Sequence, residues 1–358
     1  MSNSESVHCS DYSIHIGSDA LVGLNHLLKK EYNSLKVVVL GDSNTLEFCL
    51  PRFEEQALEG IEDVEVLEVS PGEENKQIET CIQLWKALVD VNVSRDSVVL
   101  NLGGGVVGDM GGFVASTFLR GIDFIQVPTS LLAMVDASAG GKIGVDLDHL
   151  KNYIGLFNTP KAVFIDPTFL ETLHREELIS GLAEMIKHGI ISNKAHFDEV
   201  KQLIREKGIL GAEHIVASVK IKQQIVESDF RESGERKKLN FGHTAGHAIE
   251  SFMLQADKPV MHGYAVAAGM LVEGQLSVGS GWTKEDQKEL EQLVLSVFGK
   301  INFEAEEISS IIELMSKDKK NQNQKINFTL LTAPGESAIN FFPSRDQIEN
   351  SLKYYLSL

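Results

Sequence analysis

The sequence predicts an α/β N-terminal domain with a mostly parallel sheet, followed by an all-α C-terminal domain. Between residues 36 and 127, short β-branched runs that end in turns recur at intervals of roughly 30 residues, with helical patterns between them. A glycine-rich turn follows one of these runs, and from Glu171 onward the apolar residues repeat with a helical period instead. We place the boundary just after Asp166-Pro167, which gives domains 1–168 and 169–358.

The N-terminal strands are predicted from β-branched content and from the turn that follows each run. They cover residues 36–40, 64–69, 97–102 and 124–127, with a helix over 77–89. Ligands gather at the carboxyl ends of parallel strands. The turns at 41–44, 71–76 and 103–109 are therefore expected to lie together.

The C-terminal half carries helical periodicity and few strand signals. The predicted helices cover residues 171–191, 213–229, 243–256, 263–279, 284–298 and 305–316, and the one predicted strand covers 326–331.

Composition excludes several classes of protein. The formal net charge is −18, which disfavours nucleic acid and anionic membranes as partners but leaves room for a small anion at a local cluster of cations. Three cysteines without a CxxC pair indicate a reducing compartment. The N-terminal stretch has no signal-peptide core, and no apolar run approaches the length of a membrane span. We expect a cytoplasmic protein.

The turn after the third predicted strand reads GGGVVGD, in which Gly103, Gly105 and Gly108 satisfy the pattern GxGxxG. The pattern follows a strand and precedes a helix, and bare amides at a helix N-terminus can hold a pyrophosphate. The sequence therefore predicts a Rossmann-like nucleotide site, although the loop follows a later strand than usual. The alternative is a tight turn that simply packs against its helix.

Histidines and one carboxylate suggest a metal centre. His243 and His247 are four residues apart on a predicted helix, His262 follows in a turn, and Glu184 lies upstream in AEMIKHG. A carboxylate with histidines and an open position is how a catalytic zinc is held. The spacing alone does not separate His243 from His247 as a ligand, and a helix with two structurally satisfied histidines remains the alternative.

Small and charged residues around these motifs point to an anion site. Gly242 and Gly246 allow a backbone or a ligand to approach closely. Three cations begin at Arg236, and the segment 128–142 combines hydroxyl groups with one acid and one lysine.

Together these motifs resemble the 3-dehydroquinate synthase family from about Asp42 to Lys320. The most specific stretches are GGGVVGDMGGF, PTSLLAMVDASAGGKIGVD, AEMIKHG and LNFGHTAGHAIE. The resemblance implies an NAD-binding N-terminal domain, a metal-binding helical domain and an active site between them. It also implies Glu184, His243 and His262 as ligands of one divalent metal, Zn2+ with Co2+ as an alternative, and it assigns His247 to proton transfer or phosphate binding.

The resemblance carries further roles onto matching positions. The implied catalytic residues are Lys142, Asn152, Lys187, Lys222, Glu232, Arg236, Asn240 and His247. The implied NAD+ contacts are Asp42, Asn44, Glu73, Lys76, Gly104, Gly105, Val106, Asp109, Thr129, Ser130, Lys142, Lys151, Phe169 and Thr172. The implied substrate contacts are Arg120, Asp136, Lys142, Asn152, Lys187, Lys222, Arg236, Asn240, His247, Lys319 and Lys320.

The implied reaction converts 3-deoxy-D-arabino-heptulosonate 7-phosphate to 3-dehydroquinate and phosphate. It proceeds by transient oxidation with NAD+, phosphate elimination, re-reduction and an aldol closure, in a homodimer. One position departs from the family: Tyr264 follows His262-Gly263 where an acidic residue is expected, so a carboxylate that orients a ligand is missing or replaced.

Three other functions fit parts of the pattern. Another sugar-phosphate cyclase would not need Arg236 and Asn240 as partners for a substrate carboxylate. A metal-dependent polyol dehydrogenase would not need so many anion-binding lysines. A non-catalytic NAD- or metal-binding regulator would not need the acid, lysines and histidines together.

Overall fold

The computed structural model describes residues 4–147, 150–208, 210–317 and 325–358. The chain forms two compact units. The first comprises Met1–Leu178 and Gly211–Gln223, and the second comprises Ile179–Leu210 and Gln224–Leu358. Two helices, α6 (Arg175–Ser192) and α8 (Ala212–Ser228), contribute residues to both units.

The first unit is built on a seven-stranded sheet in the order β1-β2-β9-β6-β5-β3-β4, parallel throughout except that β1 runs antiparallel to β2. Its strands are β1 (Glu5–His8), β2 (Ser13–Ile16), β3 (Val37–Asp42), β4 (Val64–Val69), β5 (Val98–Gly103), β6 (Asp123–Pro128) and β9 (Ala162–Ile165). The four predicted strands are confirmed as β3, β4, β5 and β6. Strands β1, β2 and β9 were not predicted, since each has only four residues.

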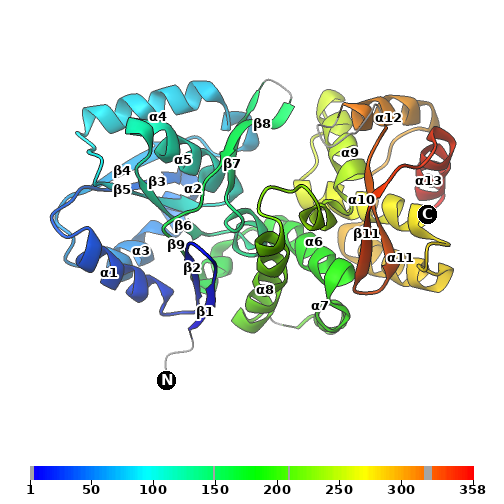
Figure 1. The fold of residues 1–358 in the computed structure, drawn as a ribbon, viewed down its shortest axis with the longest axis horizontal. Coiled ribbons are helices and arrows are strands. Elements are labelled where there is room, and N and C mark those ends of the chain that lie inside the picture. Colours follow the sequence, from blue (N-terminus) through cyan, green and yellow to red (C-terminus); the bar gives the residue numbers. More distant parts are fainter. Residues whose placement is uncertain (1–3, 148–149, 209, 318–324) are drawn as a thin grey trace. The chain divides into compact units, whose positions relative to one another are not determined.

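Helices cover both faces of this sheet (Figure 1). They are α1 (Ala20–Glu31), α2 (Ser43–Phe48), α3 (Leu50–Ala57), α4 (Ile78–Asp90) and α5 (Gly105–Thr117). On one face α4 and α5 close over Val38, Leu40 and Val99, while α1 and α3 lie on the opposite face. A hairpin of β7 (Lys142–Leu147) and β8 (Leu150–Phe157) packs on the same side of the sheet as α4 and α5. Its residues Ile143 and Val145 belong to the apolar cluster that these two helices form with the sheet.

The strand order creates a switch point beside β3. The chain moves from β3 to β4 on one side and then places β5 on the other side of β3. In a doubly wound sheet, the connections on either side of such a point run over opposite faces, and ligands bind at the carboxyl ends of the strands there. Asp42 ends β3 and Gly103 ends β5, so the topology places the glycine-rich turn where a doubly wound sheet binds its ligand.

The described residues of the second unit are helical apart from one hairpin and the connecting segments. Besides α6 it contains α7 (Lys194–Glu206), α9 (His243–Gln255), α10 (His262–Ser277), α11 (Lys284–Phe298), α12 (Ile308–Ser316) and α13 (Arg345–Ser357), with β10 (Phe328–Ala333) paired to β11 (Glu336–Phe341). The predicted C-terminal helices are confirmed, whereas α7, α13 and β11 were not predicted. No helix among the described residues is long and apolar enough to cross a membrane.

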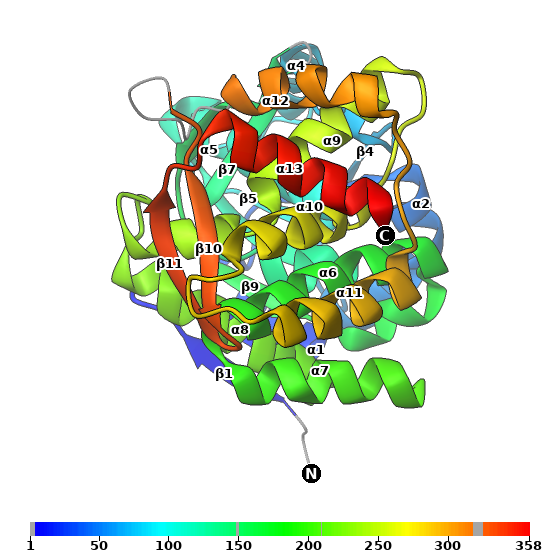
Figure 2. The same ribbon diagram turned by 90° about the vertical axis from the view of Figure 1, so that its right-hand side faces the viewer.

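Helix α10 is the centre of this unit. It contacts α9, α11, α13 and β10, and Figure 2 shows it surrounded by these elements. Its sequence from Ala265 to Gly274 consists of small and apolar residues with one acid, and every residue of that stretch is buried. A helix that is apolar on all sides packs on all sides. The central position of α10 therefore follows from its composition.

Candidate active site

The carboxyl end of β3 is shaped by Asp42, the N-cap of α2. Its Oδ1 accepts hydrogen bonds from the Thr45 amide at 2.9 Å and from the Thr45 hydroxyl at 3.1 Å. Both bonds satisfy donors at the start of the helix. One oxygen of the Asp42 carboxylate thus caps α2. Asp42 stands at the carboxyl end of β3, where the topology predicts a nucleotide site.

The glycine-rich turn contains two kinds of glycine. A Cβ on Gly103 would lie 2.6 Å from the Cβ of Val107, so internal packing explains that residue. A Cβ on Gly104 would meet nothing nearer than the Ser130 hydroxyl at 3.4 Å, and one on Gly105 nothing nearer than the Ala137 Cβ at 3.4 Å. Gly104, the N-cap of α5, has φ −72°. Packing does not explain Gly104 and Gly105, which favours the approach of a ligand over the simple tight turn.

Lys76 ties three segments together beside this turn. Its buried ammonium donates to Asp109 Oδ2 at 2.6 Å and to Asn152 Oδ1 at 2.7 Å. Burial alone lowers the pKa of Lys76, but the charges of Asp109 and Glu73 outweigh it and raise the pKa above its ordinary value. Lys76 is therefore a fixed cation between the loop after β4, helix α5 and the β7–β8 hairpin.

The hairpin is held against this loop by backbone bonds as well. Asp146 Oδ1 accepts from the Asn152 amide at 2.6 Å, and the Asp146 amide donates to the Lys76 carbonyl at 2.8 Å. Asn152 has φ +50°, a conformation that asparagine tolerates better than most residues. Lys151 precedes Asn152 in β8, and its Nζ lies 3.7 Å from Glu73 Oε1.

A second cation is fixed on α8. Lys222 is buried, and its Nζ lies 2.9 Å from Asp136 Oδ1. The neighbouring Gln223 accepts from the Tyr12 hydroxyl at 3.4 Å, and that hydroxyl accepts from the Gly140 amide at 3.1 Å. Tyr12 thereby links the start of the chain to the turn before Lys142. Sequence reasoning gave Tyr12 no role, because nothing in its local pattern indicates these contacts.

The remaining predicted residues of the first unit are placed as follows. The Thr129 amide donates to the Gly103 carbonyl at 3.0 Å, and Ser130 borders Gly104. Lys142 is exposed at the start of β7. Asn44, Val106, Phe169 and Thr172 lie in α2, in α5 and in the 3-10 turn after β9.

One predicted substrate contact, Arg120, stands apart from this cluster, and two others lie outside the described residues. Arg120 is exposed beyond the far end of α5, about 20 Å from the glycine turn at 1.5 Å per helical residue, with φ +72°. The structure does not bring Arg120 to that turn within the chain. Lys319 and Lys320 lie outside the described residues.

In the second unit, glycines bring α9 and α10 into backbone contact. A Cβ on Gly269 would lie 2.0 Å from the Gly242 carbonyl oxygen, and one on Gly246 would lie 2.8 Å from the Ala265 carbonyl oxygen. Gly242 also has φ +78°. The close approach that the glycines beside His243 allow is therefore that of a neighbouring helix backbone.

Glu273 on α10 fixes the start of α9. Its two carboxylate oxygens accept from the Gly242 amide at 2.8 Å and from the Ala245 amide at 2.9 Å, and the residue is fully buried. An anion at a helix N-terminus satisfies its free amides and complements its dipole. This contact sets the first turn of α9, which carries His243.

The start of α10 is fixed on α6 in a similar way. The Gly263 amide donates to the Ser180 hydroxyl at 3.0 Å, and a Cβ on Gly263 would lie only 2.0 Å from the Ser180 carbonyl oxygen. Glu184 lies one helical turn after Ser180, and His262 immediately precedes Gly263. The tight contact thus brings Glu184 and His262 together.

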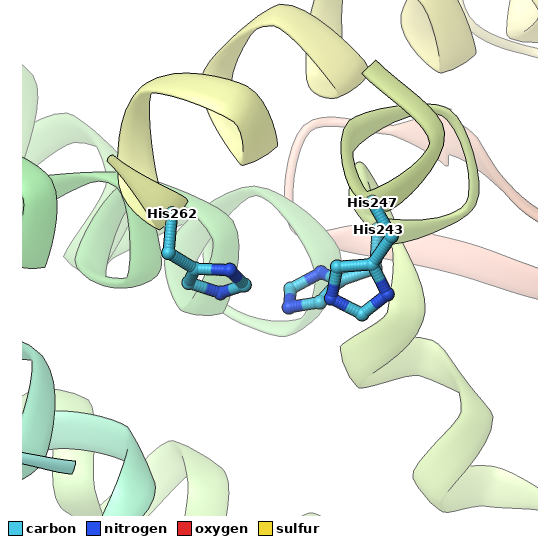
Figure 3. A group of neighbouring side chains, drawn as sticks. All are labelled: His243, His247 and His262. Atoms are coloured by element: carbon cyan, nitrogen blue, oxygen red, sulfur yellow. The ribbon is translucent and has the colours of Figure 1, made fainter. Parts of the chain in front are cut away.

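Three imidazoles converge where these helices meet. In Figure 3 the rings of His243 and His247, from α9, and of His262, from the start of α10, face one another. Their ring centroids are 5.1 to 5.6 Å apart, and ligand nitrogens of all three lie within 4.8 Å of one another. The geometry excludes the interpretation of His243 and His247 as histidines of an isolated helix face.

Glu184 distinguishes the histidines. It is fully buried, and its Oε1 lies 3.6 Å from His243 Nε2 and 3.8 Å from His262 Nε2. This Oε1 has no hydrogen-bond partner among the residues that the structure describes. Ligands bound tetrahedrally at zinc distances are about 3.4 Å apart. Glu184, His243 and His262 therefore fit one divalent cation.

Contacts of the other ring nitrogens support this set. His243 Nδ1 lies 3.2 Å from the Phe241 carbonyl, and His262 Nδ1 lies 3.4 Å from Glu250 Oε2. Both partners only accept, so each Nδ1 carries the proton and each Nε2 presents its lone pair to the cation position.

Cationic and amide groups surround this position within the second unit. The buried Lys187 pairs with Glu184 Oε2. Arg236 is buried, and its Nη1 donates to the Phe230 carbonyl at 2.6 Å. Asn240 Nδ2 donates to Glu232 Oε1 at 2.7 Å. Lys187, Arg236 and Asn240 are the residue types that bind carboxylate and phosphate oxygens.

Asp229 organises the loop that holds Arg236. One of its oxygens accepts from the Gly234 amide at 2.6 Å and from the Arg236 amide at 3.2 Å, and the other accepts from the Ser233 amide at 3.0 Å. Burial alone raises the pKa of Asp229, but these bonds outweigh it and lower the pKa to about 2. The anion that shapes this loop therefore persists at any pH near neutrality.

Tyr264 stands where the family resemblance predicts an acidic residue, and the structure shows a different carboxylate beside His262. The Tyr264 ring packs edge-on against Phe298, with centroids 5.6 Å apart, and the carboxylate beside His262 comes from Glu250. Sequence reasoning did not assign Glu250, although it lies seven residues after His243 and so on the same face of α9.

Comparison with known proteins agrees with this arrangement. Residues 66–180 match the family described as 3-dehydroquinate synthase N-terminal, and residues 181–321 match 3-dehydroquinate synthase C-terminal. The 3-dehydroquinate synthase of Parabacteroides distasonis is 40% identical over 89% of this chain and 91% of its own length. That of Clostridium acetobutylicum is 37% identical over 94% of this chain and 95% of its own length.

Solved structures share the fold. A 2-deoxy-scyllo-inosose synthase superposes with a TM-score of 0.82 at 21% identity over 98% of this chain and 100% of the other. A 2-epi-5-epi-valiolone synthase from Streptomyces hygroscopicus gives a TM-score of 0.85 at 21% identity over 99% of both chains. The relatives at 37% and 40% identity span nearly the whole chain and both family regions, and the chain belongs to the 3-dehydroquinate synthase family.

Proposed function

We propose that this chain converts 3-deoxy-D-arabino-heptulosonate 7-phosphate to 3-dehydroquinate and phosphate, with NAD+ acting catalytically. One observation carries the proposal in a chain of this family: the buried Glu184 Oε1 converges with His243 Nε2 and His262 Nε2. A carboxylate with two pre-oriented imidazoles is the donor set of a catalytic zinc.

Glu184, His243 and His262 would hold the divalent cation, Zn2+ or Co2+. When bound, such a cation lowers the pKa of a coordinated hydroxyl and polarises a carbonyl. The residues prepare this chemistry by burying the carboxylate and fixing the imidazole tautomers. His247, which faces the same position from α9, is suited to moving a proton or holding a phosphate oxygen there.

Gly104, Gly105 and the cap at Asp42 would hold the NAD+ at the switch point of the sheet. When bound, NAD+ supplies a reversible acceptor for hydride. The solved 2-epi-5-epi-valiolone synthase, which has the same fold, contains NAD+ and Zn2+. Lys76 and Asp109 would form a rigid charged pair beside the cofactor.

The substrate carries a carboxylate and a phosphate, so it needs fixed cations. Arg236 is suited to bind the carboxylate in a bidentate manner, with Asn240 beside it. Lys142, Lys187 and Lys222 would neutralise the remaining charge despite the net charge of −18. Lys187 and Lys222 are already buried against carboxylates, which fixes their positions before the substrate arrives.

We expect the assay for this function to show phosphate release over many turnovers with trace NAD+ and no net change in absorbance near 340 nm. The reason is that the hydride accepted early in the reaction returns before product release. EDTA should stop the reaction, and added Zn2+ or Co2+ should restore it. Stoichiometric NADH without phosphate would identify a polyol dehydrogenase instead.

The two kinds of glycine allow a matched test of the nucleotide site. Gly104→Ala should leave thermal stability unchanged and weaken NAD+ binding by about tenfold or more, because a methyl group fits the fold but occupies the space of a ligand. Gly103→Ala should lower stability by about 1–3 kcal/mol, because Val107 blocks its Cβ. Calorimetric titration with NAD+ and thermal unfolding of both variants separate the effects. Unchanged NAD+ affinity in Gly104→Ala would contradict this placement.

Homodimer assembly and a cytoplasmic location are further predictions from the family. Light scattering of the purified chain decides the first, and fractionation of cells decides the second.

A further inference from the structure

We propose that Glu250 is the positioning residue that sets the tautomer and orientation of His262 for metal binding. The proposal rests on the metal site of the proposed function and adds a residue to it. Its basis is the contact between Glu250 Oε2 on α9 and His262 Nδ1 at the start of α10, 3.4 Å apart.

The contact joins the buried carboxylate of Glu250 to His262, which is the more exposed of the two ligand histidines. Glu250 is 5% exposed, whereas the side chain of His262 is 29% exposed and that of His243 is 11% exposed. Because the side chain of His262 is the more exposed of the two, packing constrains its ring less than that of His243. A partner from another helix is therefore what fixes the ring of His262.

The two ligand histidines have different partners at Nδ1. His243 contacts the neutral Phe241 carbonyl of its own turn, whereas His262 contacts a carboxylate from α9. A carboxylate fixes the Nδ1–H tautomer and also makes Nε2 a stronger donor to a cation. His262 Nε2 then points to within 3.8 Å of Glu184 Oε1.

Helix spacing explains why Glu250 reaches this position. His243, His247 and Glu250 stand at positions i, i+4 and i+7 of α9, so all three lie on the face that meets His262. The ring of Tyr264, two residues after His262, packs against Phe298. The carboxylate that the residue after Gly263 would have provided is thus supplied from α9.

The test is the affinity of the purified full chain for Zn2+ and Co2+, measured in competition with a chelating dye. Glu250→Gln keeps the volume and an acceptor but removes the charge, and Glu250→Ala removes both. We expect about 10-fold weaker binding for Glu250→Gln and up to about 100-fold for Glu250→Ala. The absorption spectrum of the bound Co2+ should shift in both variants.

The matched control is Glu291→Gln. Glu291 is a comparably buried glutamate on α11, at 7% exposure, and it accepts from Gln287 rather than from a histidine. The Glu291→Gln variant should bind metal as tightly as the parent chain. Loss of affinity in this control equal to that in Glu250→Gln would show a general effect of packing and overturn the proposal.

The outcomes separate this inference from the proposed function. If the parent chain binds metal and Glu250→Gln binds it equally tightly with the same Co2+ spectrum, Glu250 is not the positioning residue and the proposed function stands. If the parent chain itself binds no metal, the metal site fails and this inference fails with it. If Glu250→Ala does not fold, the isosteric Glu250→Gln decides.

Discussion

His262→Ala and His243→Ala are each expected to remove the bound metal and to lower kcat/KM by about 10³-fold or more, with the fold retained. Each variant deletes one of three ligands, and each deleted ring is replaced by a smaller apolar side chain. Metal analysis and circular dichroism of the purified variants measure the two effects. An exposed histidine on α1 provides the control, since His26→Ala should retain both metal and activity.

Metal analysis of the histidine variants also decides whether His247 is a metal ligand in place of His243 or His262. His247 lies about as close to the other rings as they lie to each other. The assignment of His243 and His262 as ligands rests on their Nε2 atoms, which lie 3.6 Å and 3.8 Å from Glu184 Oε1. His247→Ala should therefore retain the metal while losing activity. Full metal content in His262→Ala, with loss in His247→Ala, would reverse the assignment.

The role of Glu184 as a metal ligand needs a different variant from a simple alanine substitution. Its carboxylate pairs with Lys187, and both side chains are 1% exposed. Glu184→Ala would leave the buried ammonium unpaired, at a cost of about 3–5 kcal/mol, so loss of metal in that variant would be mixed with loss of stability. The double variant Glu184→Ala with Lys187→Met removes both charges, and it should fold without binding metal.

The fold was largely predictable because its main elements carry strong local patterns. The buried parallel strands β3 and β5 are continuous β-branched runs, and α11 begins with a capping box at Thr283 and Asp286. The β7–β8 hairpin was not recognised, because the paired glycines at 144 and 155 interrupt the pattern of apolar side chains in both strands. Its strands are stabilised by packing on α5 rather than by local propensity.

Spacing alone predicted the residue types of the site and placed His243 and His247 on one helix face without separating them. The family resemblance assigned their separate roles, and in the structure Glu184 Oε1 lies 3.6 Å from His243 Nε2. Glu250 is visible in the sequence as a residue seven positions after His243, yet its partner is reached through tertiary contact. Gly242 and Gly246 signalled a close approach without indicating what approaches, because a glycine serves a ligand and a helix backbone equally well.

Gly269→Ala is expected to destabilise the second unit strongly. The new Cβ would lie 2.0 Å from the Gly242 carbonyl oxygen and 2.6 Å from the Gly246 amide nitrogen. Both obstacles are backbone atoms, so no side chain can turn aside and α9 must move away from α10. We expect a loss of about 3 kcal/mol or more, against a gain in helix propensity of at most about 1 kcal/mol.

The displacement should also weaken metal binding, since His243 belongs to α9 and His262 to α10. Urea unfolding gives the stability, and competition with a chelating dye gives the metal affinity. The control is Gly23→Ala in α1, whose Cβ would meet nothing nearer than Phe164 Cε1 at 3.5 Å and which should be neutral or slightly stabilising. A Gly269→Ala variant with an unchanged unfolding midpoint and unchanged metal affinity would mean that α9 and α10 do not need this contact to position the histidines.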